Sequence, residues 1–182
     1  MTASEHVLIL LSLVVSLALA HLLSGIARLI HARNVRWSWL HGAWMLLVFV
    51  LLIDFWISAW QLRLQETWNI LQVFFWMTMA TIQYLIAALI VPDKVPDSGI
   101  SLADFHERNR SRYIGLFFVN LVFAMAANLM LEGFSSANYI NVLGIVFMAA
   151  AGFAKPRWLQ WAGTIGLSVI FALYFAIFMA DI

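Results

Sequence analysis

The sequence predicts an all-α polytopic membrane protein, a bundle of six transmembrane helices with both chain termini on the outer, non-cytoplasmic side. Of its 182 residues, 64% are hydrophobic and only 10% are charged, and the mean hydropathy is +0.93. A soluble domain is nearer half apolar and a quarter charged. A chain of this size cannot bury so much apolar surface away from water. We therefore expect it to lie in lipid.

Six continuous apolar stretches supply the helices, because about 20 residues cross ~30 Å of hydrocarbon at 1.5 Å per residue. These stretches are residues 7–30, 40–60, 70–91, 113–131, 139–153 and 158–180. The fifth is short, so we expect it to recruit flanking residues. The connections leave little room for a soluble domain, and residues 1–182 are expected to form a single transmembrane domain.

One connection, residues 92–112, is long enough to have structure of its own. It contains two Pro-Asp pairs, which favour turns, followed by Ser101-x-x-Asp104. This spacing is that of a capping box at a helix start. We expect a helix that runs without a break from Leu102 into the fourth span.

The positive charges set the orientation of the spans. Basic residues concentrate in the odd-numbered connections: Arg28, Arg33 and Arg36 in the first, Lys94, Arg108, Arg110 and Arg112 in the third, and Lys155 and Arg157 in the fifth. Elsewhere the chain has only Arg63. Because cytoplasmic loops are enriched in Lys and Arg, the odd connections are expected to be cytoplasmic. The same side chains suit anionic lipid headgroups, although topology alone explains them.

Polar residues inside the spans form two expected layers. Asp54 lies ~9 Å from the outer boundary and His21 ~13 Å from the inner one, counting 1.5 Å per residue. The outer layer adds Ser12, Ser16 and Asn128, and the inner layer adds Gln83 and Asn120. An intramembrane carboxylate is costly and usually faces protein or water. The layers are interpreted as a polar path, or alternatively as hydrogen bonds that lock neighbouring helices together.

Several classes of function lack the residues they require. The chain has no Cys, which excludes disulfides, iron–sulfur clusters and thiolate zinc sites. It also lacks a Gly-rich phosphate loop and a Gly-x-Ser-x-Gly motif. A net charge of +1 indicates no nucleic-acid partner. We expect neither an enzyme nor a bound metal or cofactor. Haem would need two imidazoles at one depth, and His21 and His41 are expected to differ.

The segments "LAHLLSGIARLI", "DFWISAW" and "LADFHERNRSRYIGLFF" carry a family resemblance. Through them the chain resembles uncharacterised bacterial six-span inner-membrane proteins. The resemblance covers most of the chain. It implies a bacterial inner (plasma) membrane location and no particular activity.

Three functions remain open from the sequence. The first is a small channel or transporter for protons, ions or a small solute, with Asp54 and His21 on its path. The second is a non-catalytic accessory or assembly subunit of a larger membrane complex, and the third a haem-binding electron carrier. The expected partners are the lipid bilayer and further copies of the chain or subunits of a membrane complex. An aromatic stripe at Phe171, Tyr174, Phe175 and Phe178 favours such packing.

Overall fold

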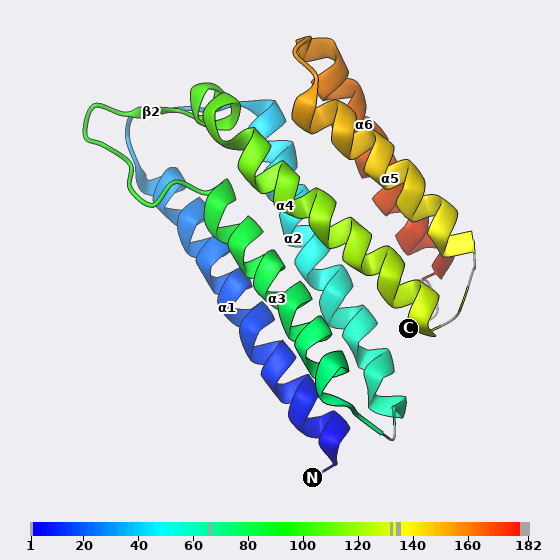
Figure 1. The fold of residues 1–182 in the computed structure, drawn as a ribbon. Coiled ribbons are helices and arrows are strands. Elements are labelled where there is room, and N and C mark those ends of the chain that lie inside the picture. The colour runs from blue at the N-terminus through cyan, green and yellow to red at the C-terminus, as the bar shows by residue number, and fades with distance from the viewer. Residues whose placement is uncertain (1, 66, 132, 134–135, 179–182) are drawn as a thin grey trace. The chain divides into compact units, whose positions relative to one another are not determined.

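The computed structural model describes residues 2–65, 67–131, 133 and 136–178 (Figure 1). This described part is all-helical, with 84% of its residues in helix and six α-helices. Five of these helices are long and apolar enough to cross a membrane. The chain divides into two compact units, residues 1–109 and 110–182. They are called the first and the second unit below.

The first unit is built on three long helices. Its elements are α1 (Ala3–His31), β1 (Val35–Arg36), α2 (Trp39–Ala59), the 3-10 helix η1 (Trp60–Leu64), α3 (Ile70–Ile90), β2 (Ile100–Ser101) and the start of α4 (Leu102–Leu131). Helix α1 packs on both α2 and α3, and α2 packs on α3. The apolar stretches predicted at residues 7–30, 40–60 and 70–91 therefore all form helices that pack together. Neither η1 nor the strand pair was expected from the sequence.

Two helices of the first unit begin with a complete capping box. At α1 the Thr2 hydroxyl accepts a hydrogen bond from the Glu5 amide while the Glu5 carboxylate accepts from the Thr2 amide. At α3, Asn69 and Gln72 exchange the equivalent pair of bonds. Each box satisfies amides that would otherwise lack a helical partner. It also explains why α1 begins four residues before the predicted span.

The connections of the first unit gather at its two ends. At one end β1 pairs in parallel with β2, with Val35 opposite Ile100 and Arg36 opposite Ser101, and so joins the first connection to the third. At the other end the buried Ser4 hydroxyl donates to the Gln65 carbonyl, and Trp68 Nε1 donates to Ser4 Oγ at 3.0 Å. The N-terminus and the second connection thus share an end. The three long helices of this unit therefore alternate in direction.

Helix α4 is a single helix of 30 residues that begins in the third connection, as its sequence predicts. The Asp104 amide donates to Ser101 Oγ at 3.4 Å, which is the first half of the expected capping box. The Asp104 carboxylate, however, turns to Arg36 on β1. The start of α4 is therefore tied to β1 as well as to its own first turn.

The second unit contains the rest of α4 together with α5 (Ser136–Phe153) and α6 (Arg157–Phe178). The last two helices approach closely, since a Cβ added to Gly163 would lie 2.6 Å from the Phe147 carbonyl oxygen. A Cβ on Gly152 would lie 2.6 Å from Ile114 of α4. Helix α5 starts three residues before the predicted span, and at 18 residues covers ~27 Å. The end of the predicted sixth span, residues 179–180, lies outside the described residues.

Candidate functional site

Two residues of the predicted inner polar layer, His21 and Gln83, lie in the first unit. His21 of α1 lies edge to face with Tyr84 of α3, with ring centroids 6.2 Å apart. Gln83, the residue before Tyr84, is 1% exposed and belongs to the buried face of α3. His21 and Gln83 are therefore close in depth, as counted from the span ends. His21 Nε2 and Gln83 Oε1 are buried and have no hydrogen-bond partner among the described residues.

Asp54 lies in the C-terminal half of α2, toward the end of the first unit that is away from β1 and β2. The next residue, Phe55, packs against Trp76 of α3 with ring centroids 6.3 Å apart. At ~100° per residue, Asp54 points to the side of this contact rather than into it. Its Oδ1 is buried and has no hydrogen-bond partner in the described part of the chain. Gln83 follows Trp76 by seven residues, so it lies ~10 Å from Asp54 along the helix axes.

The serine strip of α1 faces away from α2 and α3. The buried side of α1 consists of the residues Ser4, Val7, Leu11, Val15, Ala18, Leu22, Gly25 and Leu29. Ser12 is half-buried beside this face, whereas Ser16, Ser24 and Arg28 are exposed. The structure therefore does not bring Ser16 together with Asp54 or His21 inside the first unit. A polar strip on the outside of an apolar helix is the arrangement that suits contact with another helix.

A pair of buried histidines, which the sequence did not predict, lies at the end of the first unit that carries β1 and β2. His41 near the start of α2 and His106 in the first turns of α4 are 0% and 2% exposed. Their ring centroids are 5.9 Å apart and their planes cross at 78°. Phe105 packs edge to face on His41 at 5.5 Å, and His41 also meets the backbone of Ile90, where α3 ends. Three helices thus converge on one imidazole.

Sequence spacing gave no signal for this pair, because 65 positions separate the two residues. The sequence also does not indicate which helix packs against the start of α4. The rings meet the requirement of two imidazoles at one depth that was set for haem. They contact each other directly, however, and a porphyrin bound between them would have to part them. As folded, the pair does not fit haem. Among the described residues there is also no group of three or more His, Cys, Asp or Glu placed to hold a metal ion.

The asparagines of the predicted path lie in the second unit. Asn120 is 2% exposed and its Oδ1 is buried with no partner in the described residues, while Asn128 is half-buried. Their match in depth to His21 and Asp54 stays a prediction. Sequence reasoning missed Asn138, whose Nδ2 donates to the Gly133 carbonyl at 3.2 Å. On α6, Thr164 donates to the Gln160 carbonyl, as is common for hydroxyls inside apolar helices.

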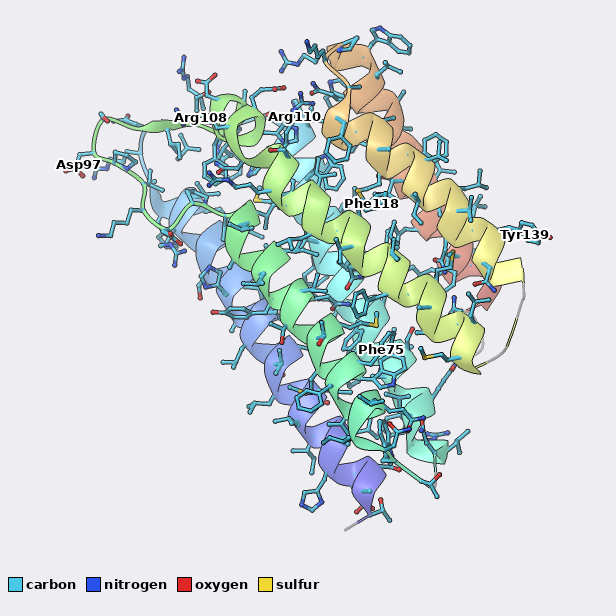
Figure 2. The ribbon with its side chains drawn as sticks, viewed as in Figure 1. Phe75, Asp97, Arg108, Arg110, Phe118 and Tyr139 are labelled. Atoms are coloured by element: carbon cyan, nitrogen blue, oxygen red, sulfur yellow. The ribbon has the colours of Figure 1, made fainter. Side chains whose placement is uncertain are left out.

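The basic residues occupy different environments. The side chains of Arg28, Arg33, Arg36, Arg108, Arg112, Lys155 and Arg157 are exposed. Arg110 differs, because its Nη1 donates to the Ala154 carbonyl at 3.0 Å where α5 ends. Figure 2 shows Arg108 and Arg110 on the first part of α4 and Asp97 at the tip of the third connection. Arg33 precedes β1 and Arg36 belongs to it, and both line a pocket.

No family model, curated protein or solved structure matches the chain. The site is therefore interpreted from its own geometry.

Proposed function

We propose that this chain is a six-span membrane protein that conducts protons, with Asp54 as the titrating group on the path. In this proposal it lies in a bacterial inner membrane with both termini outside and the β1–β2 end in the cytoplasm. The concentration of Arg and Lys in the odd connections supports this orientation. Helix α5, with 18 residues, serves as the fifth span.

The observation that carries the proposal is Oδ1 of Asp54, which is buried in an apolar helix without a hydrogen-bond partner among the described residues. A polar group in hydrocarbon without a hydrogen-bond partner costs several kcal/mol. Water or a proton removes that cost, whereas a purely structural aspartate would accept a bond from a neighbouring helix. Gln83 Oε1 and His21 Nε2, also unpartnered, offer further stations for water on the inner side.

The spacing of these groups favours protons over a dehydrated metal cation. Ligands that share one Ca²⁺ ion lie within ~5 Å of each other, since each bond is 2.3–2.6 Å long. Asp54 and Gln83 differ in depth by ~10 Å along the helix axes, so they cannot close around one ion. Intervening water is needed to link them, and a water chain passes protons.

The test is proton flux into liposomes that contain the purified full-length chain. A pH gradient is imposed, its collapse is followed with an entrapped pH-sensitive dye, and valinomycin with K⁺ compensates charge. We expect the wild-type protein to dissipate the gradient faster than empty liposomes. Asp54→Asn keeps the size and polarity of the side chain but removes the titrating group, and should reduce the flux by about 10²-fold or more, the low end for loss of a positioned proton-transfer group.

Asp93→Asn is the matched control, because Asp93 is exposed and lies in the third connection outside the helices. It should leave the flux unchanged. Wild-type flux equal to that of empty liposomes would overturn the proposed function. Equal flux in the wild-type protein and in Asp54→Asn would remove Asp54 from the path.

The exposed strip on α1 favours a second candidate, an accessory subunit of a larger membrane complex. Ser16, Ala20 and Ser24 recur every four residues on an otherwise lipid-exposed face, and small residues at this spacing allow a second helix to approach closely. Purification from native membranes in mild detergent tests it. An accessory subunit brings down stoichiometric partners that are lost in Ser16→Leu/Ser24→Leu, whereas a self-sufficient proton conductor purifies alone or with its own copies.

A further inference from the structure

The strand pair of the first unit is held in a fixed geometry. The Ile100 amide donates to the Asn34 carbonyl at 3.0 Å, and Asn34 Nδ2 donates to the Asp97 carbonyl at 3.4 Å. Gly99 has a φ of 90°, and a Cβ at this position would lie 2.3 Å from the Asn34 oxygen. Only glycine fits such a backbone approach. The first and third connections therefore form one defined surface rather than two independent loops.

An open pocket of about 370 Å³ lies on this surface. Its polar lining comes from Arg33, Asn34 and Arg36 on one side and Ser98 and Ser101 on the other. No acidic side chain is among the residues that line it. The volume is within the ~300–1,000 Å³ range of small-ligand sites. The pocket is therefore large enough for a headgroup-sized molecule and lined by donors on both walls.

The electrostatics of the pocket favour an anion. Arg33 and Arg36 contribute two guanidinium groups, whose planar forks bind phosphate with two parallel hydrogen bonds. Helix α4 begins at Leu102, directly after the pocket residue Ser101, and the start of a long helix is positively polarised. Ser101 Oγ accepts from the Asp104 amide, a bond that leaves its own hydroxyl proton able to donate.

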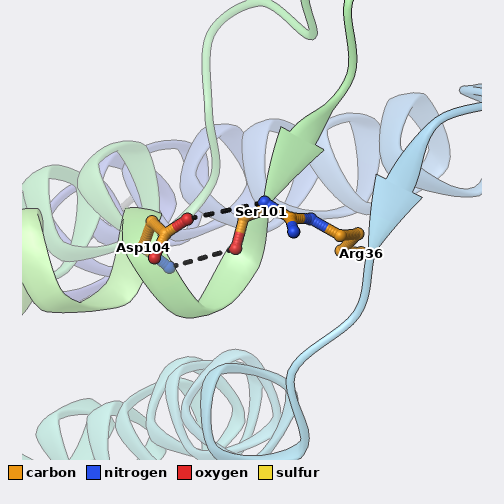
Figure 3. A network of polar contacts seen from close by, with 3 residues as sticks. All are labelled: Arg36, Ser101 and Asp104. Atoms are coloured by element: carbon orange, nitrogen blue, oxygen red, sulfur yellow. Dashed lines mark hydrogen bonds and ion pairs between the residues drawn. The ribbon is translucent and has the colours of Figure 1, made fainter.

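One acidic side chain competes for the pocket. The Asp104 carboxylate lies 3.8 Å from Arg36 Nη2, and these side chains are 66% and 82% exposed (Figure 3). An exposed pair at this distance is weak. A phosphate group, which can accept from both guanidinium groups, can displace it and engage Arg36 together with Arg33. Asp104 thus lowers the affinity of the pocket for phosphate by competing for Arg36. Removing its charge should strengthen binding.

The surroundings place the pocket at the membrane surface. Trp37 and Trp39 follow β1 and are 56% and 90% exposed, as is typical of tryptophans that anchor a protein at the headgroup level. Helices α1 and α3 end, and α2 and α4 begin, at the same end of the first unit. A ligand in the pocket would therefore lie level with lipid phosphates.

We propose that the pocket between β1 and β2 binds a phosphate group, held by Arg33 and Arg36 with Ser98 and Ser101 as further donors. Two sources supply such a group, an anionic lipid headgroup and a small soluble phosphate ester. Both sources share the chemistry that the pocket recognises, and the experiment separates them. The site is independent of the proposed proton path and does not include Asp54.

The test measures binding to the purified full-length protein in an uncharged detergent. One arm titrates glycerol 3-phosphate while the fluorescence of the neighbouring tryptophans or the heat of binding is recorded. The other arm counts retained phosphatidylglycerol by native mass spectrometry, with phosphatidylcholine as the reference of zero net charge, because its phosphate is neutralised by the choline cation. Arg33→Gln/Arg36→Gln should lose about tenfold or more in affinity, since hydrogen bonds to charged groups are among the stronger ones.

Arg108→Gln/Arg112→Gln is the matched control, because it removes the same charge from two exposed arginines that do not line the pocket. It should keep the wild-type affinity, and Asp104→Asn should raise it several-fold. If phosphatidylglycerol is retained but glycerol 3-phosphate does not bind, the pocket is a lipid headgroup site. If glycerol 3-phosphate also binds, the pocket recognises the phosphate group itself. Equal loss in the two arginine pairs, or no binding of either probe, would overturn the proposal.

Discussion

His41 and His106 pack edge to face, with ring centroids 5.9 Å apart, and neither ring has more than 2% of its surface exposed. Their contact fixes the start of α4 against the start of α2. Phe105 adds a second ring on the same imidazole. The third connection is therefore anchored from inside by an aromatic cluster and from outside by the β1–β2 pair.

This cluster leads to the first prediction. His106→Phe keeps an aromatic ring against His41, whereas His106→Ala leaves a cavity. Relative to His106→Phe, we expect His106→Ala to lower the free energy of unfolding by ~2–4 kcal/mol, as for other large-to-small core changes. Because both variants remove the imidazole nitrogens, their difference reports ring packing alone. Thermal unfolding in mild detergent, followed by circular dichroism, measures it, and equal midpoints would contradict the packing described.

Ser4 leads to the second prediction. Its hydroxyl donates to the Gln65 carbonyl and accepts from Trp68 Nε1, so one small side chain joins the N-terminus to the second connection. Ser4→Ala leaves both partners without this bond, and should destabilise the protein by ~1–3 kcal/mol. Ser16→Ala, an exposed serine on the same helix, should change stability by less than ~0.5 kcal/mol. Similar losses in the two variants would show that the Ser4 bonds contribute nothing specific.

Gly99 leads to the third prediction. Gly99→Ala must relieve both a φ of 90° and a contact of 2.3 Å with a backbone oxygen, and strained backbone of this kind costs ~1–3 kcal/mol. The strand pair should open, and the Ile100 amide, which donates to Asn34, should exchange its hydrogen faster. Gly42→Ala is the control, because a Cβ there meets nothing within 4 Å. Hydrogen exchange read by mass spectrometry distinguishes them, and unchanged exchange at Ile100 would refute the prediction.

The sequence predicts the helices well because each signal is local. The extent of α3 follows from one apolar run, and the continuous α4 follows from the Ser101-x-x-Asp104 start. The small side chain of Gly163 likewise permits the close approach of α5 and α6. These features depend on helix length, capping and side-chain size, which are all readable from neighbouring positions.

The contacts between distant segments could not be predicted in the same way. The β1–β2 pair has two residues in each strand, too few for an alternating pattern. The His41–His106 contact depends on where α4 begins relative to α2, which no periodicity encodes. Counting the helical rise gives the height of a residue along its helix but not its direction, so it did not reveal that Ser16 faces outward. Rotation of a helix about its axis is set by packing.

Arg110 illustrates the same limit and leads to the last prediction. The sequence assigns it to topology or lipid binding with Arg108, yet its Nη1 donates to the Ala154 carbonyl at 3.0 Å. Gln160 Nε2 donates to the same oxygen at 3.3 Å, so this carbonyl keeps a partner when either side chain is removed. Arg110→Gln should therefore cost only ~1 kcal/mol, near the low end for a bond from a charged donor. The exposed Arg108→Gln should cost less than ~0.5 kcal/mol.

The double variant Arg110→Gln/Gln160→Leu tests whether the two donors substitute for each other at the Ala154 carbonyl or act independently. With both donors gone, the carbonyl at the end of α5 has lost its two side-chain partners, and the loss of stability should exceed the sum of the single losses by ~0.5 kcal/mol or more. Thermal unfolding of the four proteins of this cycle in one detergent measures the coupling. Strict additivity would show that the two donors act separately, and that the turn from α5 to α6 does not depend on this carbonyl.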